Sequence, residues 1–123
     1  MNMPIQKILI VDDSPTERYV LTDILAKAGY SVSTSENGEG ILDKIKADKP
    51  QLILMDVVMP GQNGFQVTRS ITRDEDTKDI PIIICSSKGL ETDRIWGLRQ
   101  GARDYLVKPI DPKELLAKIA ALG

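Results

Sequence analysis

The chain has 123 residues, of which 41% are apolar and 28% charged, and a formal net charge of −2. This length suits one domain that buries its core without a disulfide or a metal. The near-balanced, mildly acidic charge argues against binding along nucleic-acid phosphates. The sequence contains no histidine, which excludes Ser–His–Asp catalysis, histidine metal sites and a phosphohistidine within the chain.

The expected location is the cytoplasm. The amino terminus lacks the basic and then apolar pattern of a signal peptide, and the apolar runs are too short to span a membrane. The single cysteine, Cys85, has no partner for an internal disulfide. We expect it to be a small buried apolar residue.

Short apolar runs alternate with amphipathic stretches along the chain. Strands are predicted at residues 8–11, 31–34, 52–55, 82–85 and 105–107. The first helix is predicted to be capped by Ser14, with Pro15 in its first turn, and to end at Gly29. The second helix is predicted to start at residues 37–38 and to stop before Pro50.

The remaining helices follow the same alternation. The third comes after a loop rich in Pro and Gly at residues 59–64, and the fourth covers residues 91–100 with Ile95 and Leu98 on one face. A fifth helix ends the chain. Repeated strand–helix units produce a parallel sheet. We therefore expect one open, doubly wound α/β domain over residues 1–123, with no output domain.

Polar side chains follow four of the predicted strands. They are Asp12 and Asp13, then Asp56, then Ser86 and Ser87, then Lys108. Ligands of open parallel sheets bind at the carboxyl ends of the strands. If the first and third strands are neighbours, three carboxylates converge, and a divalent cation relieves their repulsion. Oxygen ligands without His or Cys favour Mg²⁺ or Mn²⁺. A metal, a lysine and a hydroxyl around a nucleophilic carboxylate suit phosphoryl transfer.

These residues give the chain a resemblance to the receiver domain of bacterial two-component response regulators, the CheY-like family. The resemblance covers nearly the whole chain. It rests on Ile8-Leu9-Ile10-Val11-Asp12-Asp13, Leu54-Met55-Asp56-Val57-Val58-Met59-Pro60-Gly61, Asn63-Gly64, Ser86 and Val107-Lys108-Pro109. It implies a flavodoxin-like (βα)5 fold with strand order 2-1-3-4-5. Residues 12–17 and 93–105 look most like regulators of the twitching-motility chemosensory system.

The resemblance assigns the phosphoryl chemistry to the acidic residues. Asp56 is the expected phosphoacceptor. Asp12, Asp13, Asp56 and the backbone carbonyl of Val58 are the expected ligands of Mg²⁺. The chain would catalyse its own phosphoryl transfer from phosphohistidine and its own dephosphorylation, without being a conventional enzyme. A bulky Val58 gives an attacking water no hydrogen bond, so we expect slow to intermediate dephosphorylation, with Lys88 as the second residue of influence.

The resemblance also implies a switch. Lys108 and Ser86 would contact the phosphoryl group, and Pro109 would follow a cis peptide bond. Tyr105 would move inward together with Ser86, although it could also be only a core aromatic. The sole tryptophan, Trp96, is either exposed on a partner surface or packed.

The partners implied by the resemblance are a CheA-like histidine kinase, as phosphodonor, and an effector protein. The effector would bind the face formed by the fourth helix, fifth strand and fifth helix. The chain would be a messenger in twitching motility, which depends on type IV pili, or a phosphate sink for a shared kinase. We expect no nucleic acid, no membrane insertion, and a monomer or weak dimer.

The sequence also bears on three other interpretations of the fold and its acidic residues. A hydrolase of the haloacid dehalogenase type would need a second acid where Val58 stands. A flavin or dinucleotide binder would need a Gly-rich loop where Asp12 and Asp13 stand. The remaining alternative is a receiver-like module that binds partners without phosphate. Such modules usually lack one of the acids or the lysine, all of which this chain has.

Overall fold

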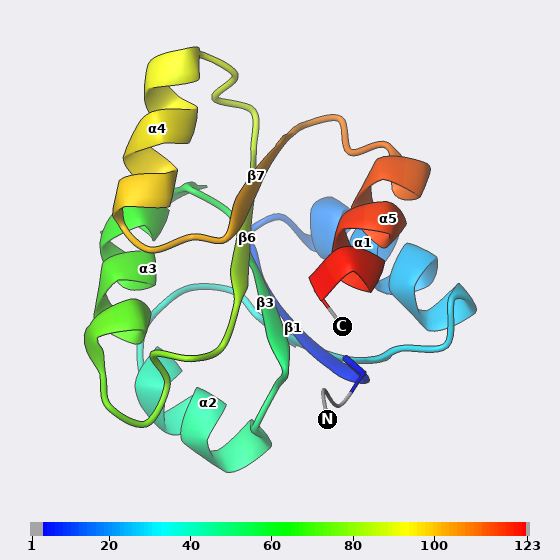
Figure 1. Ribbon diagram of the computed structural model, residues 1–123, viewed down its shortest axis with the longest axis horizontal. Coiled ribbons are helices and arrows are strands. Elements are labelled where there is room, and N and C mark those ends of the chain that lie inside the picture. Colours follow the sequence, from blue (N-terminus) through cyan, green and yellow to red (C-terminus); the bar gives the residue numbers. More distant parts are fainter. Residues whose placement is uncertain (1–3, 123) are drawn as a thin grey trace.

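In the computed structural model, which describes residues 4–122, five parallel strands form one sheet in the order β2-β1-β3-β6-β7 (Figure 1). The strands are β1 (Lys7–Val11), β2 (Ser31–Ser35), β3 (Leu52–Met55), β6 (Ile82–Ser86) and β7 (Asp104–Val107). This sequence of neighbours is the one that the resemblance implied. The predicted doubly wound fold is therefore confirmed.

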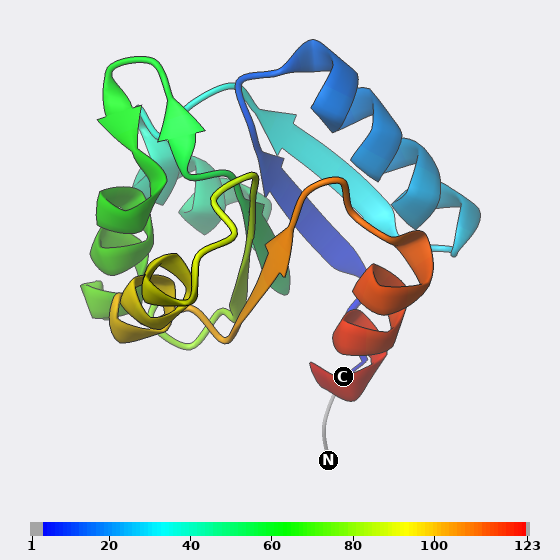
Figure 2. The same cartoon turned by 90° about the horizontal axis from the view of Figure 1, so that it is seen from above.

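Helices cover both faces of the sheet. They are α1 (Pro15–Lys27), α2 (Ile41–Asp48), α3 (Gly64–Arg73), α4 (Glu91–Arg99) and α5 (Pro112–Leu122). Figures 1 and 2 show α1 and α5 on one face and α2, α3 and α4 on the other. Successive side chains of a strand point to opposite faces, so Ile8 and Ile10 join the core under α1 and α5, whereas Leu9 and Val11 join the other core.

Local signals explain the boundaries of α1. The Ser14 hydroxyl accepts a hydrogen bond from the Glu17 backbone N–H at 3.2 Å, and Pro15 occupies the first turn. Both residues are favoured at a helix start. After the helix, Gly29 takes a φ of +97°, which a residue with a side chain adopts only with strain. The helix thus begins and ends where the sequence predicts.

A hairpin lies where only a loop was predicted. β4 (Val58–Met59) and β5 (Gln62–Asn63) pair antiparallel around Gly61. The Oε1 atom of Gln62 accepts a hydrogen bond from the Gly38 backbone N–H. Residues 36–40 form bends and a turn, and Gly40 takes a φ of +65°, which a helix interior does not allow, so α2 begins at Ile41 and not at residues 37–38 as predicted.

The predicted packing of α4 is partly wrong. Ile95 is 41% exposed and Leu98 is only half-buried, while Gly97 is the buried residue of this helix. A Cβ atom at Gly97 would lie 2.8 Å from Ile84 Cδ1 and 3.1 Å from Tyr105 Cδ2. Close approach of the helix backbone to the sheet, and not an apolar ridge, therefore seats α4.

Within residues 4–122, none of the helices combines the length and the apolar character that crossing a bilayer requires.

Candidate functional site

The register of the sheet brings the acidic strand ends together. Val11 pairs with Met55, so the next residues, Asp12 and Asp56, lie side by side. Backbone hydrogen bonds extend the sheet past the strands: the Asp56 N–H donates to the Val11 carbonyl at 2.9 Å, and the Asp12 N–H donates to the Ser35 carbonyl at 3.0 Å. Figure 2 shows the β4–β5 hairpin at the edge toward which the arrowheads of β1 and β2 point.

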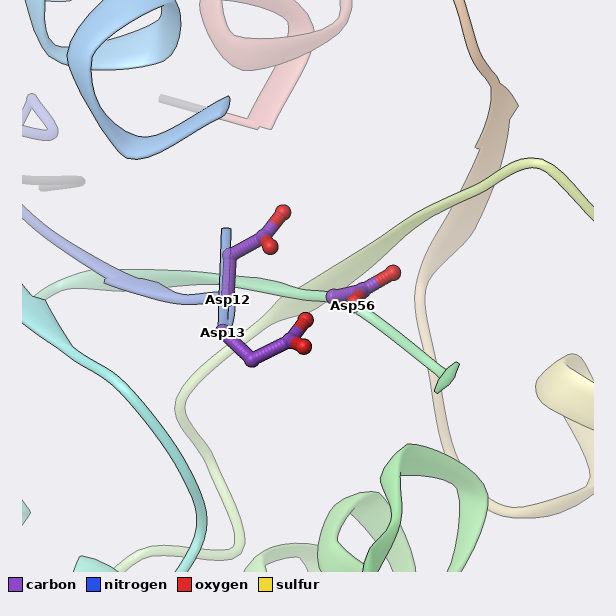
Figure 3. A group of neighbouring side chains, drawn as sticks. All are labelled: Asp12, Asp13 and Asp56. Atoms are coloured by element: carbon purple, nitrogen blue, oxygen red, sulfur yellow. The ribbon is translucent and has the colours of Figure 1, made fainter. Parts of the chain in front are cut away.

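Three carboxylates form one cluster at this edge. Asp12, Asp13 and Asp56 each offer an oxygen, and these oxygens lie within 4.8 Å of one another (Figure 3). Asp12 and Asp56 are buried, whereas Asp13 is exposed. Hard divalent cations bind carboxylate oxygens and keep several waters. A group of two buried acids and one exposed acid, open to solvent, fits such an ion.

Lys108 is the cation that partners these acids. Its Nζ atom lies 3.0 Å from Asp12 Oδ2 and 3.4 Å from Asp56 Oδ1. The Lys108 N–H donates to the Ser86 carbonyl at 2.8 Å, which extends the pairing of β6 with β7. The Lys108–Pro109 peptide bond is cis. The lysine therefore reaches across the sheet from β7 to the ends of β1 and β3.

The two sides of the cluster differ in how they are held. The Asp12 side chain is fixed at both oxygens, because Oδ1 accepts the Ser14 N–H at 2.9 Å and Oδ2 accepts Lys108. The Asp13 side chain has no hydrogen bond or ion pair with any residue from 4 to 122. Asp13 is thus the acid whose carboxylate is available to a ligand without breaking a protein contact.

The cluster shifts the titration of its members. Burial, and next the neighbouring Asp12 carboxylate, raise the pKa of Asp56 from 3.8 to about 6, against the opposing effect of Lys108. Burial opposes the charge of Lys108, but its hydrogen bond to Asp12 and the nearby acids outweigh burial and raise the pKa of Lys108. The Lys108 ammonium therefore stays charged, and it lies beside the Asp56 carboxylate, whose ionisation costs free energy.

The backbone of Lys88 joins the two residues of the expected switch. Ser86 is fully buried, and its Oγ accepts the Lys88 N–H at 3.1 Å. The Tyr105 hydroxyl donates to the Lys88 carbonyl at 2.7 Å, and the Tyr105 side chain is 6% exposed. Burial raises the pKa of Tyr105. The tyrosine therefore lies inward in this structure, tied to the loop that follows β6.

Three large apolar side chains on or next to α4 and β7 are exposed. Leu90, Trp96 and Val107 are 70%, 49% and 47% exposed. Of the two positions left open for Trp96, the structure thus selects the exposed one. Cys85, in contrast, is buried as predicted, and burial raises the pKa of its thiol to about 12.

Several contacts around the site carried no sequence signal that singled them out. Arg18 donates to the Asp12 carbonyl at 2.8 Å, and Gln62 links the hairpin to Gly38. Gly64 abuts the backbone of Asp56, where a Cβ atom would overlap the carbonyl oxygen. In the sequence, Gly64 belongs to a loop rich in Pro and Gly and to the Asn63-Gly64 pair of the resemblance, neither of which indicates a reason for the glycine. Its actual requirement is the close approach of two backbone segments beside the phosphoacceptor candidate.

Comparison with known proteins agrees with this geometry. The model of the response regulator receiver domain matches residues 8–120. The protein PilH of Pseudomonas aeruginosa is 54% identical over 116 residues, which are 94% of this chain and 96% of PilH. The phosphate regulon regulator PhoB of the same organism is 44% identical over 94% of this chain, which spans half of PhoB. The crystal structure of Vibrio cholerae CheY4 superposes with a TM-score of 0.88 at 30% identity, covering 97% of this chain and 99% of CheY4.

Proposed function

The chain belongs to the response regulator receiver domain family, and from that premise we propose that it accepts a phosphoryl group on Asp56 from a histidine kinase with the help of Mg²⁺. The observation that carries the proposal is the meeting of three carboxylate oxygens within 4.8 Å with a lysine 3.4 Å from Asp56. Carboxylates and one fixed cation around a nucleophilic oxygen are the elements that phosphoryl transfer requires.

The acids have distinct parts in this proposal. Asp13, Asp12, Asp56 and the backbone carbonyl of Val58 hold Mg²⁺, with Mn²⁺ as a substitute. Bound Mg²⁺ supplies positive charge to the phosphoryl oxygens. Asp13, which has no protein partner among the described residues, is the acid that binds without losing another contact. Asp12, held by Ser14 and Lys108, contributes a carboxylate of fixed position.

Asp56 is the nucleophile. With a pKa of about 6, its carboxylate is ionised by roughly ten to one at about pH 7 even without a metal. One carboxylate oxygen attacks the phosphorus of the donor phosphohistidine, the P–N bond breaks, and the imidazole leaves with its electron pair and takes up a proton. Lys108, already 3.4 Å from Asp56 Oδ1, neutralises charge on the transferred oxygens. Attack of water on the phosphorus later releases phosphate.

The proposed readout runs through the loop after β6. In the unphosphorylated structure, the Ser86 hydroxyl oxygen accepts a hydrogen bond from the Lys88 N–H. A phosphoryl group on Asp56 accepts a hydrogen bond from the same hydroxyl and draws Ser86 toward it. The Tyr105 hydroxyl donates a hydrogen bond to the Lys88 carbonyl. Movement of Ser86 therefore moves Lys88 and changes the position of the Tyr105 side chain. Phosphorylation thereby shifts the population of conformations at the α4-β7-α5 face. The exposed Trp96 on α4 belongs to the surface that an effector protein binds.

We assign the chain to a chemosensory system of the kind that controls twitching motility by type IV pili, where it is a messenger or a phosphate sink. The support is the 54% identity to PilH over 94% of the chain. Both functions use the same site, with a CheA-like kinase as donor. The side chain of Val58 is apolar and 56% exposed, which supports slow to intermediate dephosphorylation, because it offers an attacking water no hydrogen bond.

Intact mass after incubation with acetyl phosphate tests the proposal. The native chain should gain one phosphoryl group in Mg²⁺ and none in EDTA. Asp56→Asn should gain none, whereas the control Asp48→Asn, which removes an acid that pairs with Lys7, should behave like the native chain. Absence of the adduct, even with candidate kinases present, would replace this proposal with a phosphate-independent binding module.

A further inference from the structure

Arg18 lies behind the acidic cluster and touches its backbone. The residue is on α1, and its side chain is only 16% exposed. One terminal nitrogen donates to the Asp12 backbone carbonyl at 2.8 Å. The other lies 3.7 Å from Glu36, a carboxylate that is 76% exposed. The main polar contact of this largely buried arginine is therefore its hydrogen bond to the Asp12 carbonyl. Its ion pair with the exposed Glu36 is weak, because solvent screens it.

The carbonyl that Arg18 binds belongs to the peptide plane between Asp12 and Asp13. The side chain of Asp13 contacts no polar partner among residues 4–122, so its direction depends on its backbone alone. The other atoms of Asp12 are held separately: its N–H by Ser35, and its side-chain oxygens by Ser14 and Lys108. Among residues 4–122, the hydrogen bond from Arg18 is thus the one made to the carbonyl of the peptide plane from which Asp13 extends.

We propose that Arg18 is a positioning residue of the divalent-cation site, which orients Asp13 toward the cluster through the Asp12 carbonyl. The inference rests on the proposed function, because it requires that the acids bind Mg²⁺. Arg18 itself contacts neither the ion nor the phosphoryl group.

Charge and position predict opposite effects of removing this side chain. A guanidinium beside three acids repels a divalent cation, so the loss of its charge alone should tighten Mg²⁺ binding. The loss of a charge-assisted hydrogen bond to the Asp12 carbonyl should loosen Asp13 and weaken binding by about tenfold. The sign of the change in Mg²⁺ affinity therefore separates the two effects.

The experiment is a titration of the metal-free chain with MgCl₂ at a temperature where each variant is fully folded. Chemical shifts of the backbone amides, measured by NMR, report the Mg²⁺ affinity. Thermal unfolding of each variant in EDTA is measured alongside. Arg18→Met keeps an unbranched apolar stem without charge or donors, and Arg18→Lys keeps the charge on an ammonium that can still donate. The control is Lys27→Met, which removes a positive charge from the other end of α1, where Lys27 pairs with Asp23 at 3.1 Å.

We expect Arg18→Met to weaken Mg²⁺ binding by about tenfold and Arg18→Lys by about threefold, because the shorter ammonium replaces the guanidinium donor only in part, with Lys27→Met close to the native chain. Equal or tighter binding by a folded Arg18→Met chain would overturn this inference and leave the proposed function intact. A lower unfolding temperature with unchanged affinity would assign Arg18 a purely structural role, and would also overturn it. If the native chain binds no Mg²⁺, the proposed function and this inference fail together. If Arg18→Met does not fold, the comparison of Arg18→Lys with Lys27→Met decides, and equal affinities would refute the inference.

Discussion

The ionised Asp56 carboxylate should lower the stability of the metal-free fold, and Asp56→Asn should remove this cost. The pKa of Asp56 rises from 3.8 to about 6 on folding, first because of burial and then because of Asp12. A raised pKa means that the folded chain holds its proton more tightly than the unfolded chain. Between these two values the folded state binds more protons, so stability falls as the pH rises through this window.

The size of the effect follows from the same pKa values. A change from 3.8 to about 6 corresponds to about 3 kcal/mol at neutral pH. The Asp56 side chain is only 7% exposed, so solvent screening reduces this figure little. Asp56→Asn, which is uncharged at every pH, should therefore be more stable than the native chain by up to about 3 kcal/mol at about pH 7.5. The difference should approach zero below about pH 4, where the native carboxyl is protonated in both states.

Urea unfolding in EDTA across this pH range measures the difference directly. Asp48→Asn is the control of opposite sign, because the hydrogen bond from Ser33, together with Lys7, lowers the pKa of Asp48 despite partial burial. Its carboxylate stabilises the fold above its ordinary pKa, so Asp48→Asn should be less stable than the native chain at neutral pH and should approach it in acid. A stability gain of Asp56→Asn that does not vary with pH would refute the electrostatic reasoning.

Three further substitutions, of which Thr77→Val is a control, test buried hydroxyls and the packing beside the site. Thr68 is fully buried, and its Oγ1 has no hydrogen-bond partner among residues 4–122, so Thr68→Val should raise the free energy of unfolding by about 1 kcal/mol in urea melts. Thr77→Val should lower the free energy of unfolding by a similar amount, because the Thr77 hydroxyl donates to the Ile71 carbonyl at 2.6 Å. Equal effects of the two changes would contradict the conclusion that, of these two hydroxyls, only that of Thr68 lacks a partner among the described residues. Gly64→Ala places a Cβ atom against the Asp56 carbonyl and 2.7 Å from Val57 Cα, so it should cost at least about 2 kcal/mol and slow formation of the phosphoryl adduct; native-like stability would show that the backbones can separate.

The sheet and its acidic edge were predictable because local patterns determine them. The central strands are continuous apolar runs that are buried on both faces, apart from the half-buried Lys7 at the start of β1 and the polar Ser86 at the end of β6, and such runs mark buried parallel strands in sequence. Once β1 and β3 are neighbours, the pairing of Val11 with Met55 places Asp12 beside Asp56. The convergence of the acids therefore follows from strand order and register, and the strand order was implied by the family resemblance.

Features that depend on tertiary contacts were not predictable. The strands of the β4–β5 hairpin have two residues each, too few to show any periodicity. The seating of α4 depends on the absence of a side chain at Gly97, next to Ile84 and Tyr105, and an absent side chain gives no apolar pattern. The bond from Arg18 to the Asp12 carbonyl requires the actual path of the chain between β1 and α1.

Geometry and charge make separate demands on the acidic edge. Asp12 is fixed through its backbone and both side-chain oxygens, so its carboxylate cannot retreat from Asp56, and this proximity helps to raise the pKa of Asp56. Lys108 shares its single charge between these two acids at 3.0 and 3.4 Å, and Asp56 still remains costly to ionise. One cation is therefore too few for this edge. A second positive charge beside Asp13 relieves this repulsion. A phosphoryl group on Asp56 would replace one negative charge with about two, and so would increase the demand for that cation. The response to a ligand is thus inherent in the electrostatics of the ligand-free fold.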